Sequence, residues 1–310
     1  MFDKILVVSG PTASGKSKLA EKIYSVIPST IINADALQVY DALPILTAKP
    51  CDFQKHEKYK LYSALPPEQE CSVAKWLGLA ENEIMQAWSK QKLPVVIGGT
   101  GFYIKSLLYG LSEVPLVSDD VMGFVKQRFD KLGRERFFAL LCQADPMVAK
   151  KLHANDIYRV LRAAAVLEQA GRSIYSYLEN DVLKYKNCLH IFLDPDRANL
   201  YRWCNDRFEK MLEEGVVDEV QSFLESKNPG GSYAVEKAIG YKQIEMYLNG
   251  NISLSMVTEE VQRFTRNYAK RQYTWFRNQI QYKESFLYNS YADIENRVLE
   301  MVMRFYSELS

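Results

Sequence analysis

The chain has 310 residues, of which 39 are lysine or arginine and 38 are aspartate or glutamate, so its formal net charge is +1. This length suffices for one large domain, or for a core with a smaller partner, without disulfide or metal staples. Because the net charge is close to zero, the overall charge does not indicate a class of binding partner. Any RNA-binding surface must therefore come from locally grouped cations.

Cysteine and histidine usage argues against a disulfide scaffold and against a zinc site. The five cysteines are scattered and form no CxxC pair, which favours reduced thiols. His56, His153 and His190 are too far apart in the sequence to suggest metal ligands. The first apolar run is too short for a signal peptide, and nowhere do about 18 apolar residues follow one another. We therefore expect a cytoplasmic protein without a membrane span and, by default, a monomer.

The first and last parts of the chain alternate strands with helices. Four short apolar runs are typical of buried strands, at 5–9, 30–33, 93–97 and 188–193. Amphipathic helices are predicted at 15–27, 73–89, 198–214, 217–227, 239–248 and 253–276. This alternation indicates a parallel sheet covered on both faces, with ligands bound beyond the carboxyl ends of its strands.

The middle of the chain contains only helical patterns. They cover 119–132, 134–142, 146–152 and 156–170, and Gly171 ends the last one. We predict an all-helical insert domain over 116–186, placed within a core formed by 1–115 and 187–310. The predicted fold class is therefore α/β, with a P-loop NTPase-like parallel sheet flanked by helices and interrupted by this insert.

A complete GxxxxGKS motif follows the first predicted strand and opens a helix. It consists of Gly10, Pro11, Thr12, Ala13, Ser14, Gly15, Lys16 and Ser17. In such a loop, backbone N–H groups and the helix N-terminus surround a phosphate, the lysine adds a positive charge and the hydroxyl binds magnesium. We therefore predict a diphosphate or nucleotide site here, with Mg²⁺ as the cofactor and Ser17 as its ligand.

The loop alone does not identify the reaction, because nucleotide kinases, ATPases and prenyl diphosphate transferases all use one. A kinase or ATPase normally places an acid at the end of another strand. The run at 93–97 ends in GGTG, which has no acid. Asp194 and Asp196 follow the run at 188–193, where they would serve as that acid or as turn and N-cap residues. An NTPase thus stays open.

A second acid is expected at the same sheet edge as the phosphate loop. The segment DALQVY follows the run at 30–33 and carries Asp35. There its carboxylate would face the reacting end of a bound diphosphate. The alternative is a turn residue or a magnesium-linked acid, since aspartate often occupies loops.

Seven ordered blocks span most of the chain. They are GPTASGKS at 10–17, DALQVY at 35–40 with TAKP at 47–50, GGTGFYIKSLLYGL at 98–111, LHANDIYRVLRA at 152–163, RANLYRWCNDRFEKMLEEG at 197–215, KAIGYKQ at 237–243 and TRNYAKRQYTWFR at 265–277. Together they resemble the tRNA dimethylallyltransferases, also called isopentenyl diphosphate:tRNA transferases. The absence of the zinc-finger extension of eukaryotic relatives suggests the bacterial type.

The resemblance implies an enzyme that moves a dimethylallyl group from dimethylallyl diphosphate to N6 of the adenine next to the anticodon of tRNA, position 37, releasing diphosphate. An adenine amine is a poor nucleophile, so a base must accept its proton. Asp35 is the candidate. Arg207 would meet the departing charge together with the phosphate loop. Thr100 would help to hold the reacting groups, or would only cap the helix that follows it.

The resemblance also implies contacts with the anticodon stem-loop, whose adenine must leave its stack. Near the phosphate loop these are expected from Asp35, Ala36, Leu37, Gln38 and Thr100. The amide of Gln38 would read the adenine edge, unless it faces solvent. Farther along the chain they are expected from Arg159, Arg162, Lys237, Gly240, Tyr241, Lys242, Arg266, Lys270 and Arg271.

The run 261–280 has five cations, four interleaved aromatic side chains of tyrosine, tryptophan and phenylalanine beyond Phe264, and no acid. Such a pattern suits phosphates and splayed bases. By itself it fits a solvated basic face over a buried aromatic core better, since charge runs are often simply exposed. The family resemblance favours the RNA surface.

Several positions depart from the family pattern. Ala36 replaces serine, Asp41 a basic residue, Leu46 a glycine and Ala165 a glutamate, and 53–60 lacks paired histidines. Two other functions therefore stay open. One is a prenyltransferase acting on free AMP or ATP, or a P-loop nucleotide kinase. The other is a non-catalytic RNA-binding relative. The helical insert and the basic C-terminal helix favour a macromolecular acceptor over a free nucleotide.

Overall fold

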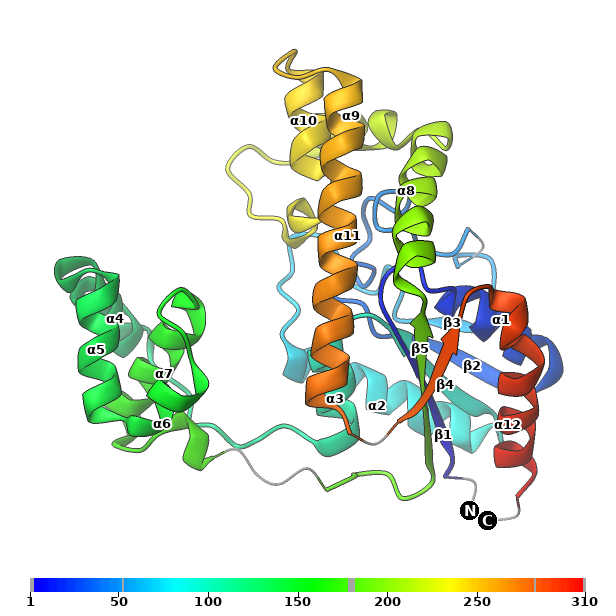
Figure 1. Cartoon of the computed structure of the whole chain (residues 1–310), viewed down its shortest axis with the longest axis horizontal. Coiled ribbons are helices and arrows are strands. Elements are labelled where there is room, and N and C mark those ends of the chain that lie inside the picture. Colours follow the sequence, from blue (N-terminus) through cyan, green and yellow to red (C-terminus); the bar gives the residue numbers. More distant parts are fainter. Residues whose placement is uncertain (1–2, 52, 178–181, 282, 309–310) are drawn as a thin grey trace. The chain divides into compact units, whose positions relative to one another are not determined.

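The computed structural model describes residues 3–51, 53–177, 182–281 and 283–308. The chain divides into two compact units, shown in Figure 1: Met1–Tyr109 with Leu183–Ser310 form the larger, and Gly110–Val182 the smaller. The division falls a few residues before the predicted limits of the insert, 116 and 186. The chain leaves and re-enters the larger unit at neighbouring points, because the Lys184 N–H donates to the Leu108 carbonyl at 2.7 Å.

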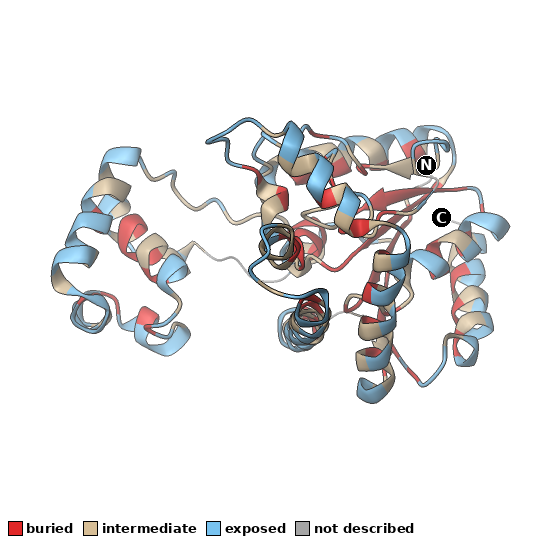
Figure 2. Cartoon of the chain, turned by 90° about the horizontal axis from the view of Figure 1, so that it is seen from above, coloured by how far each residue is buried: buried red, intermediate tan, exposed pale blue. Residues whose placement is uncertain are grey.

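A six-stranded sheet, parallel throughout, forms the centre of the larger unit, in the order β3-β2-β4-β1-β5-β6. The strands are β1 (Ile5–Ser9), β2 (Ser29–Asn33), β3 (Tyr59–Lys60), β4 (Leu93–Gly98), β5 (Cys188–Pro195) and β6 (Glu284–Tyr288). Every residue of β1, β2 and β4 is buried, as a parallel sheet covered on both faces requires. Figure 2 shows these buried strands between helices, which confirms the predicted α/β class.

The helices of the larger unit are α1 (Lys16–Val26), α2 (Val73–Ser89), α3 (Gly101–Tyr109), α8 (Arg197–Glu213), α9 (Val216–Ser226), α10 (Tyr241–Leu248), α11 (Leu254–Gln279) and α12 (Glu295–Ser307). Among them α8 and α11 pack side by side, through a small core that contains Cys204 and Ala269. A polar contact supports this packing, since Arg266 Nη1 on α11 donates to Asn205 Oδ1 on α8 at 2.6 Å. These two helices supply much of the site described below.

All four predicted strands are present, but β3, β6 and α12 were not predicted. Strand β6 has only two buried residues, Phe286 and Tyr288, and only its last three residues are apolar. It forms because its backbone pairs with the far longer β5. Helix α12 then packs on α1, where Val298 and Val302 join the core.

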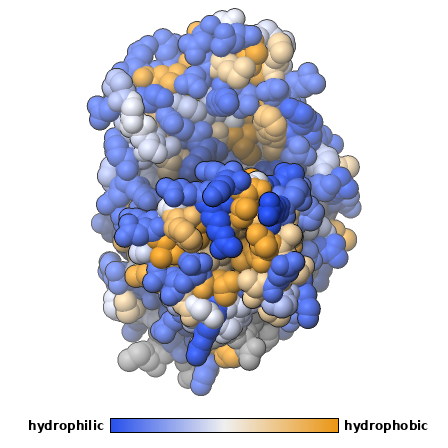
Figure 3. Space-filling view, turned by 90° about the vertical axis from the view of Figure 1, so that its left-hand side faces the viewer, coloured by the Kyte–Doolittle hydropathy of each residue, from blue (hydrophilic) through white to orange (hydrophobic). Residues whose placement is uncertain are grey.

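The regular secondary structure in the described part of the smaller unit is all helical, as predicted. It contains α4 (Asp119–Leu132), α5 (Arg134–Ala144), α6 (Pro146–Lys151), α7 (Ile157–Ala170) and the short 3₁₀ helix Ile174–Ser176. Its own core includes Val125, Phe137, Leu141 and Val160. Figure 3 shows a mostly hydrophilic face of the molecule with groups of hydrophobic side chains between. Within the described ranges, no helix is long and apolar enough to cross a membrane.

Candidate functional site

The loop between β1 and α1 has a backbone adapted to surround an anion. Gly15 has a φ of 80° at the start of α1, and Ala13 has a φ of 63°, which is unusual for a residue with a Cβ. Strain of this kind concentrates at ligand sites, where the surrounding structure holds it in place. Residues 12–17 line a cavity of about 120 Å³, which we call the loop cavity. The predicted phosphate loop therefore encloses a space at a helix N-terminus.

Lys16 lies against the loop itself. Its Nζ donates to the carbonyl oxygen of Gly10 at 3.1 Å and to that of Pro11 at 2.7 Å. Burial and the neighbouring Arg207 lower the pKa of the Lys16 amine to about 7, and the charge of Asp35 opposes this shift. A bound diphosphate would favour the charged amine, so its binding should be linked to protonation of Lys16.

This linkage gives an expected pH dependence. Above pH 7 the ligand-free protein holds Lys16 mostly uncharged, so pyrophosphate binding should take up about one additional proton near pH 8. Below pH 7 the amine is already charged and this contribution disappears. Calorimetry in two buffers of different ionisation enthalpy measures the uptake. In a Lys16→Arg control the cation is permanent, and the extra proton should be absent; equal uptake by both proteins would contradict the assignment.

Asp35 combines the turn role with a place in the site. Its Oδ1 accepts hydrogen bonds from the backbone N–H of Leu37 at 2.9 Å and of Gln38 at 3.3 Å. The side chain of Asn33 holds the turn from the other side, accepting from Asp35 N and donating to Asp35 O. The Asp35 side chain nevertheless lines the loop cavity. The hydrogen bonds to Oδ1 thus fix the orientation of the Asp35 carboxylate at the wall of the loop cavity.

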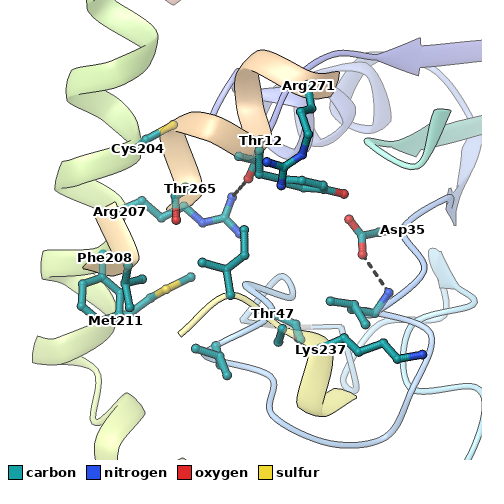
Figure 4. A pocket seen from close by; sticks show the side chains of 16 residues that line it. Thr12, Asp35, Thr47, Cys204, Arg207, Phe208, Met211, Lys237, Thr265 and Arg271 are labelled. Atoms are coloured by element: carbon teal, nitrogen blue, oxygen red, sulfur yellow. Dashed lines mark hydrogen bonds between the residues drawn. The ribbon is translucent and has the colours of Figure 1, made fainter. Parts of the chain in front are cut away.

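Arg207 reaches the same space from helix α8. Its Nη1 donates to the hydroxyl of Thr12 at 2.7 Å. Burial lowers the pKa of the guanidinium, and the charge of Asp35 opposes this effect. Figure 4 shows Asp35 and Arg207 on different walls of one pocket, with Thr12 beside Arg207. The Asp35 carboxylate and the Arg207 guanidinium therefore line the same pocket from different sides.

That pocket is a second cavity of about 270 Å³, which we call the apolar cavity. It shares Thr12, Asp35 and Arg207 with the loop cavity, so the two adjoin. Its remaining wall is largely hydrophobic and includes Leu37, Leu46, Phe208, Met211, Ala238, Ile239 and Val261. Leu46 stands where the resembled family has glycine, and only 5% of it is exposed. The site thus offers a polar space for phosphates next to an apolar one.

Thr100 and Gln38 both hold backbone segments of the site. Thr100 Oγ1 accepts from the Ala36 N–H at 2.9 Å, so its side chain supports the Asp35 turn. Thr100 also directly precedes α3, and its carbonyl accepts from the N–H groups of Tyr103 and Ile104. The Gln38 amide nitrogen donates to the carbonyls of Thr47 and Ala48 at 2.9 and 3.0 Å, so the solvent-facing alternative is wrong. The roles of these two residues toward the adenine stay predictions.

Four of the predicted RNA contacts are exposed cations of the larger unit. Lys270 and Arg271 are exposed on α11, and Arg271 also lines the apolar cavity. Lys237 is exposed at that cavity, and Lys242 is exposed on α10. Arg266 is only partly exposed and bonds Asn205. These four cations are therefore accessible from solvent, and their contact with RNA stays a prediction.

Gly240 and Tyr241 are buried, and the structure assigns them packing roles. Gly240 has a φ of 102° at the start of α10, and a Cβ there would lie 3.0 Å from Leu46 Cδ1. The hydroxyl of Tyr241 bonds Lys227 and Glu236. Their predicted contact with RNA stays a prediction, but it would have to involve the backbone or a rearrangement.

In the smaller unit, Arg159 is exposed near the start of α7, and its Nε lies 3.4 Å from Asp156 Oδ2. Arg162, one turn farther, is partly exposed and donates to the Pro115 carbonyl at 3.4 Å. Tyr158 beside them is 82% exposed. An exposed aromatic ring next to cations is a suitable surface for single-stranded RNA.

The alternative acids at the end of β5 lie elsewhere. Asp196 caps α8, accepting from the N–H groups of Ala198 and Asn199, and Asp194 accepts from Ser285 Oγ at 3.3 Å. Neither lines the loop cavity or the apolar cavity. Over the described ranges, no group of three or more histidine, cysteine or acidic side chains is arranged to hold a metal. Neither Asp194 nor Asp196 therefore supplies the acid that a kinase would place beside the loop.

Gln272 is a site residue that the sequence reasoning missed. It lines the loop cavity and is 6% exposed. The available signal was its position: it shares the buried face of α11 with Ala269 and Phe276, where an amide is unexpected. A buried amide must find hydrogen-bond partners, and here they are in the site.

The sequence and the fold of this chain are similar to those of known proteins. The IPP transferase family model matches residues 38–279. The tRNA dimethylallyltransferase of Rickettsia rickettsii (strain Sheila Smith) is 41% identical over 90% of this chain and 78% of its own length. That of Ehrlichia ruminantium (strain Welgevonden) is 40% identical over 90% of this chain and 93% of its own. The crystal structure of a tRNA isopentenylpyrophosphate transferase from Bacillus halodurans has a TM-score of 0.69 and 27% identity, and the match covers 99% of this chain and 97% of that one.

Proposed function

Since the chain belongs to the IPP transferase family, we propose that it transfers a dimethylallyl group from dimethylallyl diphosphate to N6 of adenine 37 in tRNA and releases diphosphate. One observation carries this proposal. Asp35, Arg207 and Thr12 line both the phosphate-loop cavity and the adjoining apolar cavity. A diphosphate with a short hydrocarbon tail has these two halves, and its reactive carbon lies at their junction.

The reaction would proceed by displacement at the allylic carbon. The N6 lone pair forms a bond to that carbon, and the carbon–oxygen bond breaks with its electron pair leaving on the diphosphate. Asp35 accepts the proton that N6 loses, which preserves a neutral amine in the product. Lys16 and Arg207 meet the negative charge that develops on the leaving oxygen. The turn that fixes Asp35 keeps the base oriented before the adenine arrives.

The oxygen donors of the loop suit magnesium. Ser17 is exposed at the loop cavity and offers a hydroxyl, a hard oxygen ligand of the kind that Mg²⁺ prefers alongside phosphate oxygens. When bound there, the ion would add positive charge at the leaving diphosphate. In this binding mode the protein supplies few ligands, here the Ser17 hydroxyl, and the phosphate oxygens of the substrate complete the coordination.

The anticodon stem-loop would approach the cavity mouth along α11. Lys270 and Arg271 are exposed there, and Lys237 is exposed at the same cavity. Such cations bind phosphates without reading sequence, and so place the flipped adenine above Asp35. Arg159 and Arg162 of the smaller unit would contact a further part of the same RNA. We propose that one copy of the chain suffices for this reaction.

A parallel incubation tests the acceptor and the donor together. The protein is mixed with Mg²⁺ and dimethylallyl diphosphate and with either an anticodon stem-loop or AMP, and adenosine is analysed by mass. We expect the gain of one dimethylallyl group on the stem-loop only. Product on AMP alone would replace the RNA acceptor with a free nucleotide. The absence of product on both, with the protein folded, would remove the proposed reaction.

A further inference from the structure

A buried amide connects the long C-terminal helix to the phosphate loop. Gln272 of α11 accepts a hydrogen bond through Oε1 from the backbone N–H of Thr12, at 2.8 Å. Its Nε2 donates to the carbonyl oxygen of Gly99 at 2.9 Å. The two partners belong to loops that follow neighbouring strands, β1 and β4. One side chain thus spans the gap between two loops at the sheet edge.

The fit around this amide is close. A Cβ on Gly99 would lie 2.2 Å from Gln272 Nε2, and a Cβ on Gly101 would lie 2.1 Å from the ring of Trp275 on the same helix. Both distances are far shorter than a van der Waals contact, so glycine at these two positions lets α11 approach the loop after β4. The amide therefore has little freedom to move.

Thr12 is held from two directions as a result. Gln272 accepts from its N–H, and Arg207 donates to its hydroxyl at 2.7 Å. Thr12 lies in the wall of both cavities. Its conformation therefore determines where the start of the phosphate loop stands.

We propose that Gln272 is a positioning residue that holds the phosphate loop in the conformation that receives diphosphate. This inference rests on the proposed function for its ligand, and it adds that the helix expected to bind RNA also shapes the donor site. Without the amide, the Thr12 N–H loses its buried acceptor, and an unsatisfied donor is costly enough to rearrange a short loop. The remaining loop amides would then face the phosphate less well.

The first test replaces Gln272 with methionine, which keeps the length of the side chain and removes both hydrogen bonds. The matched control is Gln262→Met on the same helix, where the amide bonds Glu209 away from both cavities. Calorimetry measures binding of pyrophosphate with Mg²⁺, and fluorescence anisotropy measures binding of a labelled anticodon stem-loop. We expect the Kd for pyrophosphate to rise about tenfold in Gln272→Met and to stay unchanged in the control. The Kd for the stem-loop should change less than about twofold in both proteins.

Unchanged pyrophosphate affinity in Gln272→Met would overturn the inference. So would an equal loss of stem-loop binding, because it would assign Gln272 to the RNA surface or to the helix as a whole. Should Gln272→Met fold poorly, the second variant is Gly99→Ala, whose added methyl group would displace Gln272 Nε2 while Gln272 itself is kept. This variant should also bind pyrophosphate more weakly than the wild type. An affinity equal to that of the wild type would contradict the proposed role of Gln272. These measurements need no prenyl transfer. The role of Gln272 can therefore be refuted while the proposed reaction stands, and the proposed reaction can be refuted while the role of Gln272 stands.

Discussion

An Asp35→Asn enzyme should turn over about 10³-fold more slowly than the wild type while binding the stem-loop with an affinity within about twofold. Asparagine keeps the oxygen that accepts from the N–H groups of Leu37 and Gln38, so the turn survives. It cannot accept the proton from N6 at neutral pH. The substitution therefore separates the base from its structural role, which alanine would not do.

Single-turnover rates under saturating donor and enzyme give the chemical step directly, and anisotropy gives the affinity for the stem-loop. Asp41→Asn is a suitable control, because Asp41 is an exposed acid on the same segment and lines neither cavity. If Asp35→Asn lost binding as much as rate, Asp35 would belong to recognition. An undiminished rate would exclude it as the base.

The second large effect is expected for Arg207→Gln, whose kcat/KM for the donor should fall by about 10² to 10³. Arg207 is the cation that both cavities share, and it also holds the Thr12 hydroxyl. Its removal leaves the departing diphosphate with less positive charge at the bond that breaks. The pyrophosphate affinity should fall less than the rate, because charge accumulates on the leaving oxygen during the reaction.

Steady-state kinetics at varied donor concentration, with pyrophosphate affinity from calorimetry, measure this difference. Arg202→Gln is the matched control, since Arg202 is exposed on the same helix and bonds only its neighbour Asn199 in the contacts described. Equal losses in rate and affinity would make Arg207 a binding residue. A kcat/KM near that of the wild type would remove it from the reaction.

Most elements with local signals were predicted to within a residue or two, although α11 ends three residues later than expected. Helix α4 is an example: Ser118 caps its start by accepting from Val121 N–H, and Gly133 ends it, so both limits are encoded within a few positions. Strand β6 has no such signal, because its stability comes from pairing with β5, about ninety positions earlier. Local patterns cannot reveal an element whose partners are distant in the sequence.

The same distinction applies to the site. The phosphate loop and the nearby Asp35 were predicted from local motifs, and both line the loop cavity. Arg207 was assigned through family resemblance alone, since its partner Thr12 is 195 positions away. Gln272 was not predicted, and neither was the hydrophobic wall of the apolar cavity apart from Leu37. They become site residues only when α8 and α11 pack beside the sheet, which a motif search does not represent.

The helical unit, Gly110–Val182, contributes no residue to either cavity. Every residue that lines the two cavities lies within 12–99 or 204–272, and none within the helical unit. The two chain segments that lead to and from that unit are joined by the backbone hydrogen bond from the Lys184 N–H to the Leu108 carbonyl. The residues that line the two cavities and the helical unit thus occupy separate parts of the chain, so a change in the length of that unit would leave every lining residue in place.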